Sequence, residues 1–118
     1  MQVAFVGLGV MSFPMAGHLA RAGHDVAVFN RSPAKAERWA QAHDGRAATG
    51  IAEAARGAEI VFLCVGNDED VRGVVRQALP AMAPGGVIVD HTTTSAKVAR
   101  EMAALAQESG RSFVAAPV

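Results

Sequence analysis

Cysteine, tyrosine and net charge are scarce in this sequence, and each shortage excludes a class of protein. Among 118 residues there is one cysteine, Cys64, one tryptophan and no tyrosine. A single cysteine cannot close a disulfide within the chain, so we expect a reducing compartment, the cytoplasm. Eleven Lys and Arg residues balance eleven Asp and Glu residues. No net field therefore attracts nucleic acid or an anionic membrane surface.

Long apolar runs and metal-ligand spacings are also missing. The apolar N-terminal run has no basic segment before it and is interrupted by Gly7 and Gly9, so neither a signal peptide nor a membrane span fits it. The four histidines and the cysteine show no spacing typical of a metal site. A chain of this length builds one hydrophobic core but not two, which predicts a single domain over residues 1–118.

The sequence does contain a regular alternation of short apolar runs and longer amphipathic runs. The short runs are rich in Val, Ile and Phe, as is typical of strands buried on both faces of a parallel sheet. The predicted strands are Gln2–Val6, Asp25–Phe29, Gly45–Ala47, Ile60–Val65, Gly86–Val89 and Ser112–Ala115. The predicted helices are Phe13–Ala22, Pro33–His43, Ile51–Arg56, Asp68–Leu79 and Ser95–Ser109. This alternation predicts an α/β fold of the Rossmann type, a doubly wound parallel sheet of six strands in the order 3-2-1-4-5-6.

Signals at the helix ends support these boundaries. Gly23 and Gly110 stand where a left-handed residue commonly ends a helix. Ser32 before Pro33 indicates an N-cap followed by a proline in the first turn. The acidic segment at 68–70 predicts a capped start for the fourth helix, with charges that suit the helix dipole.

A glycine-rich segment, VGLGVMSFPMAG at positions 6–17, follows the first predicted strand, where ligands bind in such folds. Gly7 permits a tight turn, and Gly9 removes the Cβ that would meet a pyrophosphate. The next helix directs its free N–H groups towards that anion. Ser12 stands where the third glycine of a dinucleotide-binding loop is usual, and it is compact enough to pack there or to cap the helix. We expect cofactor contacts from Gly7, Leu8, Gly9, Val10, Met11 and Ser12; a plain strand-to-helix turn is the alternative.

An uncharged residue, Asn30, ends the second predicted strand, where NAD-binding domains usually carry an acid for the ribose hydroxyls. A carboxylate there would repel a 2′-phosphate, whereas Arg31 offers a planar fork of donors and a face that stacks on adenine. Ser32 and Lys35 can add a hydroxyl contact and a positive charge. This segment favours NADP over NAD and disfavours a flavin or S-adenosylmethionine. The alternative is an exposed basic turn at the start of a solvated helix.

Three segments together resemble one enzyme family. GLGVMSFPMAGHLARAGHDVAVFNRSPAK, at positions 7–35, is similar to the N-terminal signature of the β-hydroxyacid dehydrogenases, which include 3-hydroxyisobutyrate dehydrogenase and tartronate semialdehyde reductase. VFLCVGNDEDVRGVV, at 61–75, resembles the family's segment after the fourth strand. IVDHTTTSAKVAREMAALAQESGRSFVAAPV, at 88–118, resembles the stretch from the family's IDxST motif to its DAPVSGG motif. The likeness covers almost the whole chain.

The resemblance implies a role for several residues. Val65 and Gly66 hold the place of a pair that lies against the cofactor, and Thr93 would contact its nicotinamide end, with Thr92 beside it as a candidate substrate contact. The reaction implied is the reversible reduction of a small aldehyde or keto acid to a hydroxy acid by a homo-oligomer. The family's catalytic lysine and all-helical substrate domain are expected beyond residue 118. We therefore assign no catalytic residue within the chain and expect the chain alone to be inactive.

The chain departs from the family pattern at three positions, and two other functions stay open. Ser12 replaces a glycine, His18 an asparagine and Ala115 an aspartate. The first is an imine reductase, which would share this half of the protein and replace the lysine downstream. The second is a domain that binds NADP without catalysis. His91 follows the fifth predicted strand near the expected nicotinamide end, where a packing role and a catalytic role compete.

Overall fold

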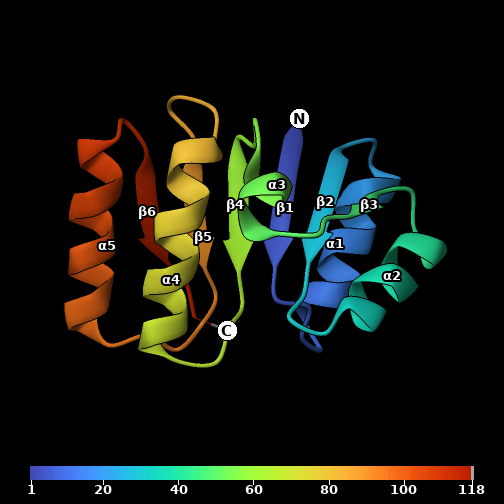
Figure 1. The fold of residues 1–118 in the computed structure, drawn as a ribbon, viewed down its shortest axis with the longest axis horizontal. Coiled ribbons are helices and arrows are strands. Elements are labelled where there is room, and N and C mark those ends of the chain that lie inside the picture. Colours follow the sequence, from blue (N-terminus) through green and yellow to red (C-terminus); the bar gives the residue numbers. More distant parts are fainter. Residues whose placement is uncertain (118) are drawn as a thin grey trace.

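Six parallel strands form one sheet in the computed structural model, which describes residues 1–117 (Figure 1). The strand order is β3-β2-β1-β4-β5-β6, so the predicted order is confirmed. The strands are β1 (Gln2–Val6), β2 (Asp25–Phe29), β3 (Arg46–Ala47), β4 (Ile60–Leu63), β5 (Val87–Asp90) and β6 (Ser112–Ala115). The helices are α1 (Ser12–Arg21), α2 (Pro33–Ala42), α3 (Ile51–Ala55), α4 (Asp68–Ala78), α5 (Ala96–Glu108) and the short 3-10 helix η1 (Leu79–Ala81).

The central strand β1 lies where the winding of the sheet reverses. It pairs with β2 on one side and β4 on the other, so that Val6 aligns with both Phe29 and Leu63. Because the three strands are parallel, their carboxyl ends meet at one edge of the sheet, together with the loops that follow them. In doubly wound folds this edge is the place where ligands bind.

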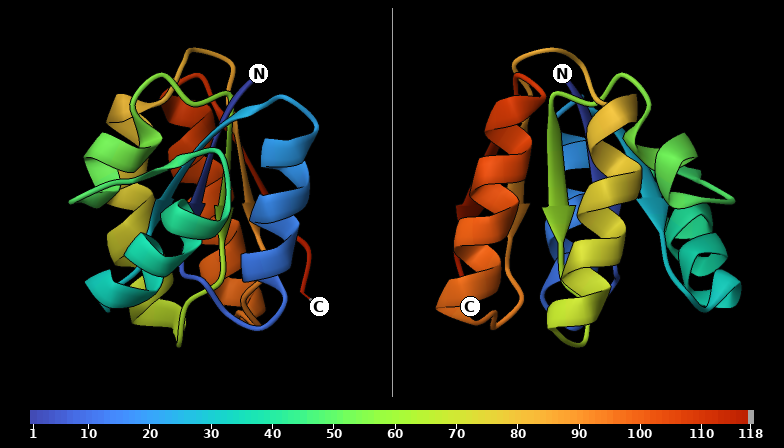
Figure 2. Two further views of the ribbon diagram at one scale, coloured as in Figure 1. Left: turned by 90° about the vertical axis from the view of Figure 1, so that its right-hand side faces the viewer. Right: turned by 60° about the vertical axis from the view of Figure 1, so that its left-hand side comes forward.

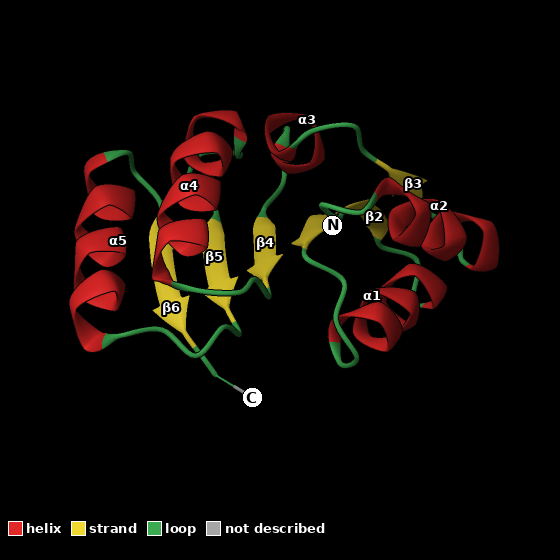
Figure 3. Ribbon diagram, turned by 60° about the horizontal axis from the view of Figure 1, so that its bottom comes forward, coloured by secondary structure: helices red, strands yellow, loops and turns green. Residues whose placement is uncertain are grey.

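Side chains alternate across β1 and divide the core into two clusters. Ala4 and Val6 pack on the face that α3, α4 and α5 cover. Val3 and Phe5 pack on the opposite face, with α1, α2 and the fully buried Trp39. Figures 2 and 3 show these helices on the two sides of the strands. Burial of both faces explains why the strands are almost continuously apolar in sequence.

Some boundaries differ from the predicted ones by one or two residues. The strand predicted to end at Val65 ends at Leu63, because the Val65 amide donates to Thr92 Oγ1 at 3.0 Å instead of continuing the ladder. β5 extends to Asp90, which pairs with Leu63 in β4 and Ala115 in β6. The first helix begins at residue 12 instead of 13.

The predicted helix ends have mixed outcomes. Gly23 and Gly110 adopt the left-handed backbone, with φ of +94° and +77°. Ser32 does occupy the N-cap position before Pro33, but its side chain makes no capping hydrogen bond. Its carbonyl oxygen accepts a hydrogen bond from the Lys35 amide at 3.2 Å. Within residues 1–117, no helix has the length and apolar character needed to cross a membrane.

Candidate functional site

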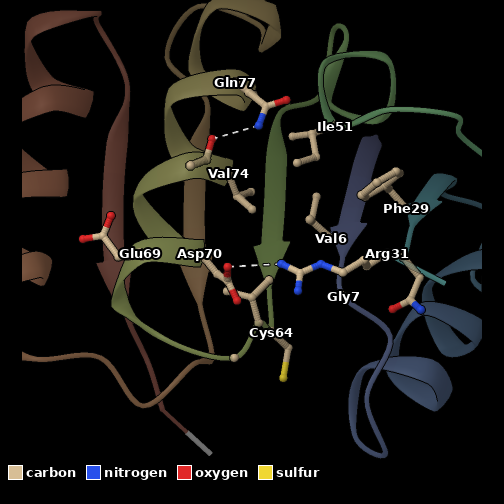
Figure 4. Close-up of a pocket in the computed structure, with 14 residues that line it drawn as sticks. Val6, Gly7, Phe29, Arg31, Ile51, Cys64, Glu69, Asp70, Val74 and Gln77 are labelled. Atoms are coloured by element: carbon tan, nitrogen blue, oxygen red, sulfur yellow. Dashed lines mark hydrogen bonds and ion pairs between the residues drawn. The ribbon is translucent and has the colours of Figure 1, made fainter.

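A cavity of about 460 Å³ opens at the carboxyl edge of β1, β2 and β4, beside α4 (Figure 4). Its volume is within the range of small-molecule sites. Side chains from both halves of the sheet line it, which places it at the reversal of the winding. The lining residues are Val6, Gly7, Phe29, Asn30, Arg31, Ile51, Cys64, Val65, Gly66, Glu69, Asp70, Gly73, Val74 and Gln77.

The two glycines in the loop after β1 differ in whether the fold leaves room for a side chain at their position. Gly7 has a φ of +90°, and its amide donates to the Phe29 carbonyl at 2.9 Å. A Cβ at Gly7 would lie 2.8 Å from the carbonyl carbon of Cys64 and overlap its oxygen, so the fold itself requires glycine there. A Cβ at Gly9 would meet only the Cys64 Sγ, at 3.7 Å, which is an ordinary contact. The protein's own packing therefore does not require glycine at position 9.

The backbone amides of this loop fall into two groups. The Leu8 amide donates to Asn30 Oδ1 at 2.9 Å, so a ligand does not have free access to it. No residue among 1–117 accepts a hydrogen bond from the amides of Gly9, Val10 or Met11. These three amides precede α1, whose positive dipole end suits an anion. Val10 is also 91% exposed.

Asn30 connects the loops that follow β1 and β2. Its Oδ1 accepts from the Leu8 amide, and its Nδ2 donates to the Ser32 carbonyl at 3.2 Å. We interpreted Asn30 in the sequence only through the cofactor, as a neutral residue in place of an acid. The bonds to the two loops were missed, because nothing local to Asn30 indicates its contact with a residue 22 positions earlier.

Arg31 extends across the cavity from the end of β2 and forms an ion pair with Asp70 of α4 (Figure 4). The distance from Nη2 to Oδ1 is 3.1 Å, and the side chains are 87% and 25% exposed, respectively. Ser32 and Lys35 do not line the cavity, although they follow Arg31 in the chain. The structure thus brings Arg31 to the site together with an acid that the cofactor analysis of the sequence did not include.

The acidic start of α4 does not cap the helix as predicted. The N-cap is Asn67, whose side chain accepts from the Asp70 amide at 2.9 Å. The acids instead have separate partners: Asp68 accepts from the Ser95 amide at 3.1 Å, and Glu69 pairs with Arg72. The hydrogen bonds from Ser95 hold the pKa of Asp68 below its usual range. The reason for the difference is that a side chain at Asn67 reaches the free amides of the first turn more directly than acids inside it.

A buried carboxylate orders the loop after β5. Asp90 is fully buried and accepts hydrogen bonds from the Thr92 amide at 2.9 Å and the Thr94 hydroxyl at 2.6 Å. Thr92 is 6% exposed, and its hydroxyl accepts from the Val65 amide, which joins the loops after β4 and β5. A substrate contact by Thr92 stays a prediction; its side chain is buried in this structure. Thr93 is exposed, as a residue available to a ligand must be.

The other singled-out residues have clear environments. Ser12 is buried as the first residue of α1, the N-cap is Met11 and no side chain caps the helix, so of the two alternatives for Ser12 the structure shows packing and not capping. The His91 ring stacks on Phe62, with centroids 5.9 Å apart, and its Nδ1 lies 2.8 Å from the Ala116 carbonyl oxygen. His91 does not line the cavity. This geometry favours the packing role for His91.

The site can hold an anionic, partly apolar molecule, but it offers little for proton transfer. Neither of the two lysines, Lys35 and Lys97, lines the cavity, and no histidine of the described residues does. Within residues 1–117 no group of three or more His, Cys, Asp or Glu side chains could hold a metal ion. The cavity walls are mostly apolar, with Arg31, Glu69 and Asp70 as the charged lining residues, and the three amides without an acceptor among the described residues belong to the neighbouring loop after β1 and not to the lining itself.

Comparison with known proteins agrees with this geometry. Residues 2–118 match the model of the family described as the NAD binding domain of 6-phosphogluconate dehydrogenase. An uncharacterized oxidoreductase of Shewanella frigidimarina is 52% identical in an alignment 120 residues long, gaps included, that covers 99% of this chain and 41% of that protein. The chain thus spans about two fifths of the length of such relatives.

Two solved structures extend the comparison. The 3-hydroxyisobutyrate dehydrogenase of Mycobacterium tuberculosis, solved with L-serine, matches with a TM-score of 0.89 and 35% identity over 98% of this chain and 40% of its own. A reductive aminase of Aspergillus terreus in complex with NADPH and ethyl levulinate matches with a TM-score of 0.80 and 25% identity, over 99% of this chain and 40% of its own. Together with the family match, the fold and the cavity lead to one conclusion: the chain belongs to the family of the NAD binding domain of 6-phosphogluconate dehydrogenase.

Proposed function

We propose that this chain binds NADP at the carboxyl edge of the sheet and is the cofactor domain of a 3-hydroxyacid dehydrogenase. The observation that carries the proposal is Arg31, which lines the cavity next to the uncharged Asn30 at the end of β2. A guanidinium at this place binds a 2′-phosphate through charge-assisted hydrogen bonds, and no carboxylate at position 30 opposes it. The reductive aminase structure in complex with NADPH is consistent with the choice of the phosphorylated cofactor.

Each part of the cofactor has a matching part of the site. The amides of Gly9, Val10 and Met11 would hold the pyrophosphate at the start of α1. The amides of Gly7 and Leu8 bind Phe29 and Asn30 and so hold this loop against the end of β2, and Ser12 is buried at the start of α1. We assign the 2′-phosphate to Arg31, with Ser32 beside it at the N-cap of α2 and Lys35 in the first turn of α2. The adenosine would lie in the cavity between α3 and α4.

The opposite end of the cofactor would lie near the loops after β4 and β5. There Val65 and Gly66 line the cavity, and Thr93 is exposed. The nicotinamide ring, when bound, supplies the hydride, so this chain's residues orient the ring and shield it from water. The substrate would be a small 3-hydroxy acid and its aldehyde or keto acid, consistent with the similarity to 3-hydroxyisobutyrate dehydrogenase.

Two related functions compete with this proposal. Reduction of an imine is favoured by the similarity to the reductive aminase. Binding of NADP without catalysis is the other, and it would be supported if the full-length protein lacks a lysine at the family's catalytic position. Under all three functions the chain alone binds the cofactor and shows no turnover of an aldehyde acid, and turnover by the chain alone would contradict them.

The test is a calorimetric titration of the purified protein with NADPH and with NADH. We expect Arg31→Asp to weaken NADPH binding by about 10- to 150-fold, the equivalent of one charge-assisted hydrogen bond worth about 1.5–3 kcal/mol. NADH binding should change much less. Arg38→Asp is the matched control, because Arg38 is an exposed residue of α2 that does not line the cavity. An equal loss for both cofactors in Arg31→Asp would refute the 2′-phosphate assignment.

A further inference from the structure

Arg31, to which we assign the 2′-phosphate, is already paired with Asp70 in this structure. Arg31 lies in the β2–α2 connection and Asp70 in the first turn of α4, 39 positions later. Both side chains line the same cavity, and Figure 4 shows the contact between them. A phosphate that binds Arg31 therefore has to displace the Asp70 carboxylate, with which Arg31 is already paired.

The pair is weak enough to open. Only one nitrogen of Arg31, Nη2, contacts Asp70, at 3.1 Å, although a guanidinium has five N–H donors. Arg31 is 87% exposed, so water competes with the contact. Exposed ion pairs of this kind contribute little to stability because solvent screens them. Arg31 can therefore exchange Asp70 for a ligand anion at modest cost.

Asp70 is held more firmly than its partner. Its side chain is 25% exposed, and its amide is fixed by the Asn67 side chain at 2.9 Å. Because its backbone is fixed in the first turn of α4, Asp70 keeps its carboxylate beside the cavity when Arg31 turns to a ligand. A 2′-phosphate next to it meets a like charge, whereas the plain ribose hydroxyl of NADH does not.

We propose that Asp70 is a specificity-determining residue. It competes with the 2′-phosphate for Arg31 and so reduces the ratio by which the site prefers NADP over NAD. The proposal rests on the NADP assignment above. Asp70 lowers the affinity for NADPH in two ways, since it occupies Arg31 in the free protein and repels the phosphate in the complex. Neither effect acts on NADH.

The experiment compares Asp70→Asn with the unaltered protein by calorimetric titration with NADPH and NADH at low and high salt. We expect Asp70→Asn to tighten NADPH binding about two- to fivefold, which is the range for an exposed ion pair. NADH binding should stay the same. The gain should shrink at high salt, where exposed charges are screened.

Asp68→Asn is the matched control. It removes the same charge from the same helix turn, but Asp68 pairs with the Ser95 amide and does not line the cavity. Asparagine keeps an oxygen for that bond, so both cofactors should bind as before. A gain for NADPH in Asp68→Asn equal to that in Asp70→Asn would mean that helix charge alone acts, and would overturn the proposal.

Arg31→Ala separates the two proposals. If Arg31→Ala leaves NADPH binding unchanged, the NADP assignment fails. If Arg31→Ala weakens NADPH binding but Asp70→Asn leaves it unchanged or weakens it, only the role of Asp70 fails, and weaker binding would mean that Asp70 positions Arg31 for the phosphate. In the double variant Arg31→Ala, Asp70→Asn, we expect a smaller gain from Asp70→Asn than in the protein with Arg31, because only the repulsion between Asp70 and the phosphate is then removed.

Discussion

Alanine at each of the two glycines after β1 should separate folding from cofactor binding. Gly7→Ala places a Cβ on a backbone with φ of +90° and against the Cys64 carbonyl. Gly9→Ala places one at 3.7 Å from the Cys64 Sγ, with a φ outside the left-handed region. The same substitution, two positions apart, therefore acts on different properties of the protein.

The magnitudes follow from these contacts. Backbone strain at Gly7 costs about 1–3 kcal/mol, and forcing an extra carbon into packed backbone adds about 1–3 kcal/mol. We expect the free energy of unfolding of Gly7→Ala to fall by about 2–6 kcal/mol. Gly9→Ala should change it by less than about 0.5 kcal/mol, as for a surface substitution without a clash. Its NADPH binding should weaken at least about tenfold, because a phosphate held by the Gly9 amide has to approach the backbone closely.

Two measurements on each variant test this reasoning. Urea unfolding gives the free energy of unfolding, and calorimetric titration with NADPH on the folded protein gives the dissociation constant. If Gly9→Ala binds NADPH as tightly as the unaltered protein, the loop after β1 does not hold the pyrophosphate. If Gly7→Ala unfolds at the same urea concentration as the unaltered protein, the fold does not require glycine at position 7.

Two further predictions concern hydrogen bonds away from the loop. Thr92→Val should lower the free energy of unfolding by about 1–3 kcal/mol, because the Val65 amide loses its acceptor, whereas Thr93→Val should leave urea unfolding unchanged. Hydrogen bonds from Arg72 hold the pKa of Glu101 below its usual 4.5, so the unfolded state takes up a proton first as the pH falls. The stability from this pair is complete above pH 4.5 and is lost as the pH falls through the lower pKa of the folded state. Urea unfolding measured from neutral to acidic pH should therefore show a smaller decrease in the free energy of unfolding for Glu101→Gln than for the unaltered protein. Equal decreases would contradict the lowered pKa of Glu101.

Much of the fold can be read from local patterns in the sequence. The apolar runs predict all six strands, and their alternation with helices predicts the order in the sheet, since right-handed crossovers leave few arrangements. Gly7, Gly23 and Gly110 have the left-handed backbone that such glycines permit. Ser12 illustrates the limit of local patterns: it is compatible with a cap or with packing, and only the position of the helix start distinguishes the two.

The contacts of the site are harder to predict, because they join residues far apart in the chain. Asn30 binds the Leu8 amide, and Thr92 binds the Val65 amide. Each residue has an ordinary local alternative, such as a turn or an exposed surface. One signal could have pointed to Asp70. It lies in an acidic segment that follows β4, and the carboxyl end of β4 is at the same edge of the sheet as that of β2, after which Arg31 lies.

For this protein, residue periodicity and glycine placement were enough to predict the sheet order and the tight turn at Gly7 after β1, because these depend on neighbours along the chain. The partner of Arg31 was a different kind of question. α4 starts with three acids, and no local pattern distinguishes them as partners of Arg31. In the folded protein, Asp70 is the one of the three that pairs with Arg31. That choice arises from the way parallel strands bring the loops after β2 and β4 to one edge, a spatial relation that no local pattern contains.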